Sequence, residues 1–278
     1  MAGAQTTVKS APEKLPKTSM PPASFGGKMI YVVGNIQGVG KREQQEDSFG
    51  FGNALDTGAI DRQGLMAVVA DGMGGMKNGK LASDTAVSVI LDAFRRMDLR
   101  SSIPQQLQDA AIAAGDRVLD QLQGSGGSTL VAGLFYQEML WTVSVGDSYI
   151  FLLHDRKLVR LNHSQNVLSR DSLELIMNGS MDRTEVLRSP EKDAITHFLG
   201  MPGLDETDLL RSPLKLSAGD VLMFCSDGVG GFLSERYIEE CLLERTPKEM
   251  CDALEAGLRS RDHKYQDNYT ALVVQCRR

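Results

Sequence analysis

Residues 68–79, VVADGMGGMKNG, end an apolar run with one aspartate, Asp71, and then place three glycines within four residues. Upstream, LMAVVAD at 65–71 predicts a short buried strand. Downstream, apolar residues recur at helical spacing from Ala82 to Met97 and predict a helix. Glycine-rich backbone is costly to order. The aspartate and the glycines at this junction between strand and helix therefore need an explanation from the rest of the chain.

Beyond this junction, helices and strands occur in separate blocks. Four apolar segments between 127 and 160 are separated by short polar breaks such as YQE and DRK, a spacing typical of antiparallel hairpins. Elsewhere the periodicity predicts helices at about 104–122, 165–178, 234–244 and 247–260, and strands at 220–225 and 268–276. Such segregation favours a layered α+β domain that contains antiparallel sheets.

The overall composition excludes several classes of protein. At 278 residues, 42% hydrophobic and 24% charged, the chain is typical of a globular protein with a sizeable core. No apolar run approaches the roughly 20 residues that span a bilayer, and no signal-peptide core is evident, so we expect a cytoplasmic protein. A net charge of −6 argues against a nucleic-acid partner.

The first 27 residues differ from the rest, with four prolines, several Ser, Thr and Lys, and few large apolar groups. This composition predicts a disordered tail over 1–27 and a folded domain over 28–278.

Acidic residues recur where apolar strands begin or end: Glu46 and Asp47, Asp71, Asp147, Asp227 and Asp267. Any one of them is explained by a turn. Five such motifs at one rim of packed sheets would repel one another unless cations lay between them. Oxygen ligands without histidine or thiolate favour Mg²⁺ or Mn²⁺ over Zn²⁺.

Six motifs in order resemble the PPM-type (type 2C) metal-dependent serine/threonine protein phosphatases in their bacterial form: R-x-Q-Q-E-D-S at 42–48, DGMGG at 71–75, GST at 127–129, VGDS at 145–148, CSDG at 225–228 and DNYT at 267–270. The resemblance covers about residues 28–276. It implies a four-layer α-β-β-α sandwich of two antiparallel sheets flanked by helices, a binuclear metal site at one end, and a variable flap at about 163–199.

The resemblance also implies roles for individual residues. Asp71 and the carbonyl of Gly72 would be metal ligands, together with Glu46, Asp227 and Asp267, and Asp47 would hold a metal-bound water. Arg42 would bind the substrate phosphate through its fork of donors. Two Mn²⁺ or Mg²⁺ ions would then generate a bridging hydroxide that attacks phosphorus directly, without a phosphoenzyme.

In two places the chain departs from the family pattern. Met73 occupies a position where animal members carry a histidine proposed as general acid, and methionine cannot donate a proton. Asp147 matches a ligand of a third, weaker ion, but Gly231 stands where some members add a further aspartate.

The resemblance implies phosphoprotein substrates, the products of a serine/threonine kinase, and we expect a monomer. Two alternatives stay open: a catalytically weak scaffold that recognises phosphoproteins, and a hydrolase of phosphodiesters or small phosphate esters.

Overall fold

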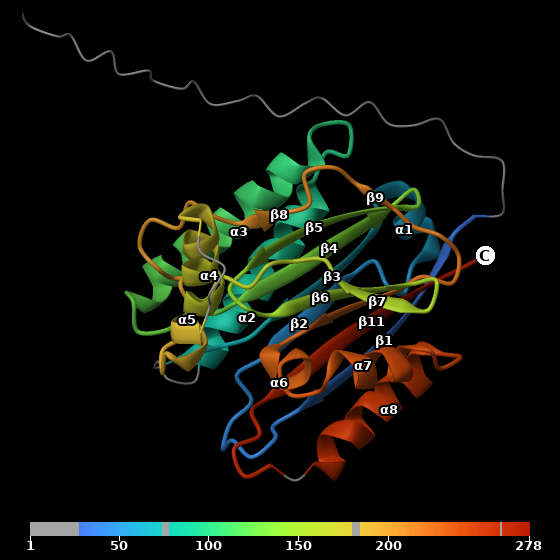
Figure 1. Ribbon diagram of the computed structural model, residues 1–278. Coiled ribbons are helices and arrows are strands. Elements are labelled where there is room, and N and C mark those ends of the chain that lie inside the picture. Colours follow the sequence, from blue (N-terminus) through green and yellow to red (C-terminus); the bar gives the residue numbers. More distant parts are fainter. Residues whose placement is uncertain (1–27, 74–77, 180–183, 262) are drawn as a thin grey trace, which may run out of the picture.

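The computed structural model describes residues 28–73, 78–179, 184–261 and 263–278. Two antiparallel sheets are packed face to face (Figure 1). One sheet has the strand order β1 (Ile30–Gly38), β11 (Tyr269–Arg277), β10 (Val221–Cys225), β6 (Tyr149–His154) and β7 (Lys157–Arg160). The other has the order β2 (Ser48–Gly52), β3 (Leu65–Ala70), β4 (Leu130–Tyr136), β5 (Met139–Val145) and β8 (Asp208–Leu209), with β9 (Leu214–Lys215) also paired to β5.

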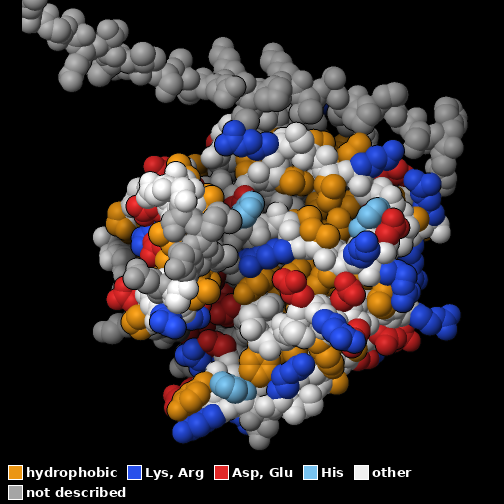
Figure 2. Space-filling model, in the orientation of Figure 1, with side chains coloured by type: hydrophobic (Ala, Val, Ile, Leu, Met, Phe, Trp, Pro, Cys, Tyr) orange, Lys and Arg blue, Asp and Glu red, His pale blue; other side chains and the backbone are white. Residues whose placement is uncertain are grey.

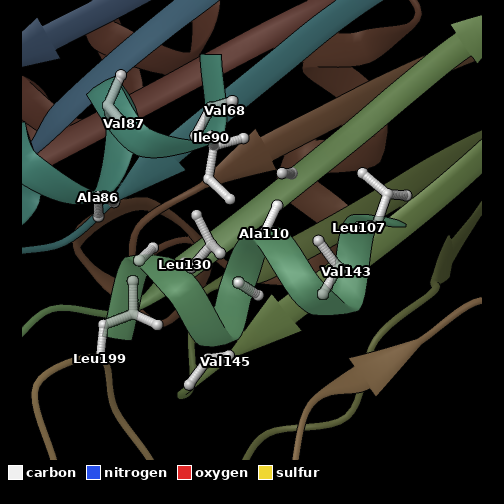
Figure 3. Packing of buried hydrophobic residues seen from close by; sticks show 14 of the residues in the cluster. Val68, Ala86, Val87, Ile90, Leu107, Ala110, Leu130, Val143, Val145 and Leu199 are labelled. Atoms are coloured by element: carbon white, nitrogen blue, oxygen red, sulfur yellow. The ribbon is translucent and has the colours of Figure 1, made fainter. Parts of the chain in front are cut away.

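Helices cover the outer face of each sheet. α2 (Gly79–Arg96) and α3 (Ile103–Leu122) pack on the β2–β5 sheet, and Figure 3 shows Ile90 of α2 and Leu107 of α3 directed into this layer. α7 (Glu235–Leu242) and α8 (Pro247–Ser260) pack on the other sheet. The predicted four-layer sandwich is therefore confirmed. The shorter helices are α1 (Thr57–Gln63), α4 (Val167–Met177), α5 (Thr184–Arg188) and α6 (Asp227–Gly230).

The continuous apolar run of β3 is explained by burial on both faces. Met66, Val68 and Ala70 face the helices α2 and α3. Leu65, Ala67 and Val69 alternate with them and face the opposite sheet. Successive strand residues point to opposite faces, and here both faces lie in a core, so no polar position interrupts the strand.

The hairpin prediction for 127–160 is correct for two connections and wrong for the third. β4–β5 and β6–β7 are antiparallel hairpins. β5 and β6 belong to different sheets, and the chain crosses between them at Gly146, whose φ of 96° favours glycine. Local spacing cannot separate a hairpin from such a crossing, since both need only a short polar break. The crossing places Asp147 at the rim shared by the two sheets.

The helix expected near 165–178 is α4, and it lies with α5 in the predicted flap. The tail predicted over 1–27 lies outside the described residues, so the domain boundaries stay a prediction. Among the helices of the described ranges, none combines the length and apolar character needed to cross a bilayer.

Candidate metal centre

Strand register brings the acidic motifs to one end of the sandwich. Ser48 of β2 pairs with Ala70 of β3, so Asp47 and Asp71, the residues next to this pair, come together. In the other sheet, Cys225 pairs with both Tyr149 and Ala271, which places the residues just beyond β10 beside the starts of β6 and β11. Figure 2 shows acidic side chains in a recess between the α4–α5 segment and the helices below it.

Asp71 is fixed through its backbone by the start of β4. Its N–H donates to Thr129 Oγ1 (3.1 Å), and its carbonyl accepts from Thr129 N (2.9 Å) and Ser128 Oγ (3.0 Å). Gly72 follows in a narrow gap, where a Cβ would lie 2.3 Å from the carbonyl oxygen of Gly79 and 2.5 Å from that of Glu46. Only glycine fits there. This explains the first glycine after Asp71; Gly74 and Gly75 lie outside the described residues.

Four of the carboxyl groups have raised pKa values. Desolvation is the largest cause for each, and repulsion from neighbouring aspartates adds to it. The pKa of Asp71 lies well above its ordinary value, since Asp47, Asp227, Asp147 and Asp267 all contribute. The pKa of Asp47 rises to about 6 and that of Asp147 to about 7, and the pKa of Asp227 is also raised. These groups therefore form one interacting cluster.

Asp47 carries the clearest sign of a missing partner. Its side chain is fully buried, and Oδ2 accepts a hydrogen bond from Ser226 Oγ (2.9 Å). Oδ1 is buried without a hydrogen-bond partner among the described residues. The neighbouring Asp71 carboxyl is within hydrogen-bonding reach, but the two acids can share a hydrogen bond only while one of them is protonated. A cation or a cation-bound water would satisfy this oxygen.

Arg42 and Asp267 are also brought together, as an ion pair at the edge of the cluster. Arg42 Nη2 donates to Asp267 Oδ2 at 2.5 Å, and both side chains are about half exposed. The Asp267 carboxylate is thus held by a guanidinium. The Glu46 carboxyl lies against Gly79 at the start of α2.

The donor set fits a hard divalent cation. Carboxylates and a backbone carbonyl are the oxygen ligands that Mg²⁺ and Mn²⁺ prefer, and the desolvation and mutual repulsion at Asp47, Asp71 and Asp227 are what a cation would relieve. In the described ranges, no three His, Cys, Asp or Glu side chains already enclose an ion-sized site. The Arg42–Asp267 pair contributes to this, because it holds one carboxylate at the edge.

The two departures from the family pattern lie near the cluster. The backbone of Met73 bonds to the carbonyl of Gly127 (3.0 Å). Gly231 closes the short helix α6 through a bond to the carbonyl of Asp227 (2.8 Å). His154, His163 and His197 instead contact Asp220, Asp208 and Glu206, carboxylates outside the cluster, while His263 packs edge-on against Phe232.

Sequence reasoning missed the residues that hold the site together: it quoted the motif that contains Asn268 without giving Asn268 a role, and it did not single out Lys80. Asn268 of DNYT accepts from Glu46 N (2.8 Å) and donates to the carbonyls of Val39 and Gln44, both at 2.9 Å. It thereby ties the acidic loop to the start of β11. Lys80 donates to the carbonyl of Asp47 (2.9 Å) from the first turn of α2. No spacing rule identifies these contacts, because they join segments far apart in sequence.

Comparison with known proteins gives consistent matches. The family model described as protein phosphatase 2C matches residues 43–257. The serine/threonine phosphatase stp of Listeria monocytogenes is 30% identical over 246 residues, covering 84% of this chain and 91% of that protein. The serine/threonine protein phosphatase PstP of Mycobacterium tuberculosis is 29% identical over 215 residues, 75% of this chain and 40% of that protein.

Solved structures match the fold over most of its length. Stp1 from Staphylococcus aureus superposes with a TM-score of 0.74 at 20% identity, covering 92% of this chain and 99% of that one. The catalytic domain of PstP in complex with two manganese ions gives a TM-score of 0.70 at 23% identity, covering 90% and 100% of the two chains.

Proposed function

Because the chain belongs to the protein phosphatase 2C family, as its motifs predicted, and is a protein serine/threonine phosphatase, we propose that its carboxylate cluster binds two Mn²⁺ or Mg²⁺ ions and hydrolyses phosphoserine and phosphothreonine in proteins. The observation that carries the metal site is the meeting of Asp47, Asp71 and Asp227, where a buried oxygen of Asp47 has no hydrogen-bond partner among residues 28–73, 78–179, 184–261 and 263–278. The catalytic domain of PstP, which shares this fold, was solved with two manganese ions.

In this proposal, the ions would be held by Asp71, the carbonyl of Gly72, Glu46, Asp227 and Asp267. Asp147, which is electrostatically coupled to Asp227, is the candidate ligand for a weaker third ion. When bound, the ions supply positive charge and a water of lowered pKa. Asp47 would orient that water through Oδ1, the oxygen that has no hydrogen-bond partner in the part of the chain that the structure describes.

Arg42 would bind the substrate phosphate. Its guanidinium pairs with Asp267 at the edge of the cluster and is half exposed, so it can reach an incoming anion. A guanidinium can offer two parallel N–H donors to a phosphate.

Hydrolysis adds one water oxygen to phosphorus and breaks the bond between phosphorus and the seryl oxygen, which must gain a proton. Met73 cannot provide it, and the histidines with carboxylate partners outside the cluster are engaged there. We therefore infer that the leaving oxygen is protonated from solvent. A good leaving group such as p-nitrophenolate needs no such help.

The test compares wild type with Asp71→Ala and Asp227→Ala on phosphoserine and phosphothreonine peptides, with and without Mn²⁺. We expect metal-dependent phosphate release that both substitutions abolish while the circular dichroism spectrum is retained. Release that persists in excess EDTA would contradict the metal mechanism. Peptide binding without turnover would instead favour a scaffold, and faster cleavage of a bis-aryl phosphodiester would favour a different esterase.

The substrate proteins, the opposing kinase, the cytoplasmic location and the monomeric state remain predictions from sequence.

A further inference from the structure

A polar pocket of about 360 Å³ lies outside the carboxylate cluster. One wall is the loop at 37–41, which leads from β1 toward Arg42. The others are Glu255 and Arg259 of α8, together with Gln266 and Tyr269 before and at the start of β11. None of these side chains has a role in the proposed hydrolysis.

The pocket shares its walls with the candidate metal centre. Gln37 at its floor donates to the carbonyl of Asp47 (3.3 Å) and to Thr270 Oγ1 (3.2 Å). Lys41 N donates to the carbonyl of Gln266 at 2.8 Å, and the next residues of the same two loops are Arg42 and Asp267, which form the ion pair at the cluster. The two loops therefore lie between the pocket and the cluster. Lys41 and Gln266 line the pocket, whereas the next residues, Arg42 and Asp267, lie at the cluster.

The charges in the pocket favour an anion. Lys41 and Arg259 contribute two positive charges against the single negative charge of Glu255. Glu255 is occupied, because its Oε1 accepts from Arg259 Nη2 (2.7 Å) and from the Tyr269 hydroxyl (3.3 Å). Glu255 thus holds Arg259 in place at the pocket wall. A guanidinium carries five N–H donors, more than Glu255 engages, so Arg259 keeps donors for a further oxyanion.

The two sites adjoin along the chain, at Lys41 and Arg42. Lys41 and Arg42 are neighbours, with Cα atoms about 3.8 Å apart, and two or three residues of extended peptide span about 7–10 Å. A peptide whose phosphoserine meets Arg42 can therefore place a side chain two or three residues away in the pocket.

We propose that this pocket is a substrate subsite for a second anionic group, either an acidic side chain or a second phosphate, two or three residues from the phosphorylated serine or threonine. This inference rests on the proposed function of the neighbouring centre. It assigns Lys41 and Arg259 to substrate selection.

The experiment measures kcat/KM on three sets of phosphoserine peptides: with alanine at all flanking positions, with glutamate two and three residues to either side, and with a second phosphoserine there. For wild type we expect about a fivefold preference for anionic over alanine peptides, which is modest because Arg259 is largely exposed and its contacts are screened. The glutamate and phosphoserine sets distinguish the two anion sources.

Arg259→Gln should reduce the ratio of kcat/KM between anionic and alanine peptides to about one, because KM for the anionic peptides rises. Arg259→Lys should retain part of the preference. Arg236→Gln on α7 is the matched control, since it also removes an exposed arginine that is paired with a glutamate four residues away. The Arg236→Gln variant should prefer anionic over alanine peptides to the same extent as wild type. Equal kcat/KM for all peptides in wild type, or a preference unchanged in both Arg259→Gln and Lys41→Gln, would overturn the proposal.

The alanine peptide separates this outcome from failure of the proposed function. If wild type does not release phosphate from it with Mn²⁺, the hydrolytic proposal fails. The subsite is then tested by fluorescence anisotropy of the same labelled peptides. Tighter binding of anionic peptides that Arg259→Gln abolishes would support the pocket, and equal binding would refute it.

Discussion

Asp47→Asn should stabilise the metal-free protein while it abolishes turnover. Desolvation and neighbouring carboxylates raise the pKa of Asp47 from 3.8 to about 6. Each unit of pKa corresponds to about 1.4 kcal/mol, so holding this buried group ionised costs about 3 kcal/mol at pH 8. Asparagine removes the charge, can still accept from Ser226, and places an amide donor toward Asp71.

The gain should depend on pH in a definite direction. An acid whose folded pKa is raised binds more protons in the folded state, so its contribution to stability falls as pH rises from 3.8 through about 6. At pH 5 most of the Asp47 carboxyl is already protonated, and linkage reduces the advantage of asparagine to roughly half of that at pH 8. At pH 8 the full 3 kcal/mol corresponds to an increase in Tm of about 6–10 °C.

The assay is urea unfolding of chelator-treated protein at pH 5 and pH 8, followed by peptide dephosphorylation with Mn²⁺. Asp252→Asn on α8 is the control, because it removes an exposed carboxylate paired with Lys248 and should change stability by at most about 0.5 kcal/mol. A metal-free Asp47→Asn protein that is no more stable than wild type at pH 8 would refute the electrostatic account of the cluster.

Three further outcomes are expected. Mn²⁺ should raise Tm more at pH 8 than at pH 5, because protons on Asp47 and Asp147 compete with the metal at the lower pH. The pKa values of these two groups are about 6 and about 7. Equal increases in Tm in thermal scans at the two pH values would contradict this. Arg42→Ala should raise KM for phosphopeptides roughly tenfold. The affinity for Mn²⁺ measured by calorimetry should stay equal or become tighter, since Asp267 is then no longer paired with a guanidinium that competes with the metal. Weaker Mn²⁺ binding would contradict this competition between Arg42 and the metal. Gly72→Ala should lower stability by about 2 kcal/mol or more and impair turnover, since its Cβ would meet two carbonyl oxygens; unfolding at the wild-type urea concentration would show that the gap is not rigid.

The sequence locates the acidic residues at strand ends because each stands next to an apolar run, and strand ends are the clearest boundaries in an apolar pattern. It did not predict their partners. Arg42 pairs with Asp267 across 225 positions of sequence, and Asn268 joins Glu46 to the carbonyls of Val39 and Gln44. Side-chain contacts of this range depend on strand order, which local periodicity does not contain.

The pocket beside the centre was missed for a similar reason. In the sequence, Lys41 and Arg259 are isolated charged residues. They line one pocket only because residues 37–41 lie close to α8 in the fold. The sequence pattern predicts a hairpin at Gly146, but packing decides whether β6 pairs with β5 or joins the other sheet, and the short polar break does not contain that information.

The apolar pattern of β3 leaves its register open, and the site helps to fix it. A slip by one residue exchanges the two faces of a strand, which is costly where one face is polar. In β3 both faces are apolar and buried, so hydrophobic burial barely distinguishes the two registers. Shape and hydrogen bonding make the difference instead. Gly133 of β4, which pairs with Ala67, leaves room for the ring of Phe224 between the sheets, since a Cβ there would lie 2.3 Å from that ring.

At the end of β3, Asp71 can bond to Thr129 and Ser128 only in this alignment, and Gly72 must fall in the gap beside Gly79. Slipping β3 by one residue would put Asp71 or Met73 into that gap and bury a carboxylate or a thioether against two carbonyl oxygens. The features that assemble the carboxylate cluster are therefore also those that select the strand register. This gives a physical reason for the glycine after Asp71: it is needed to align the sheet as well as to open the site.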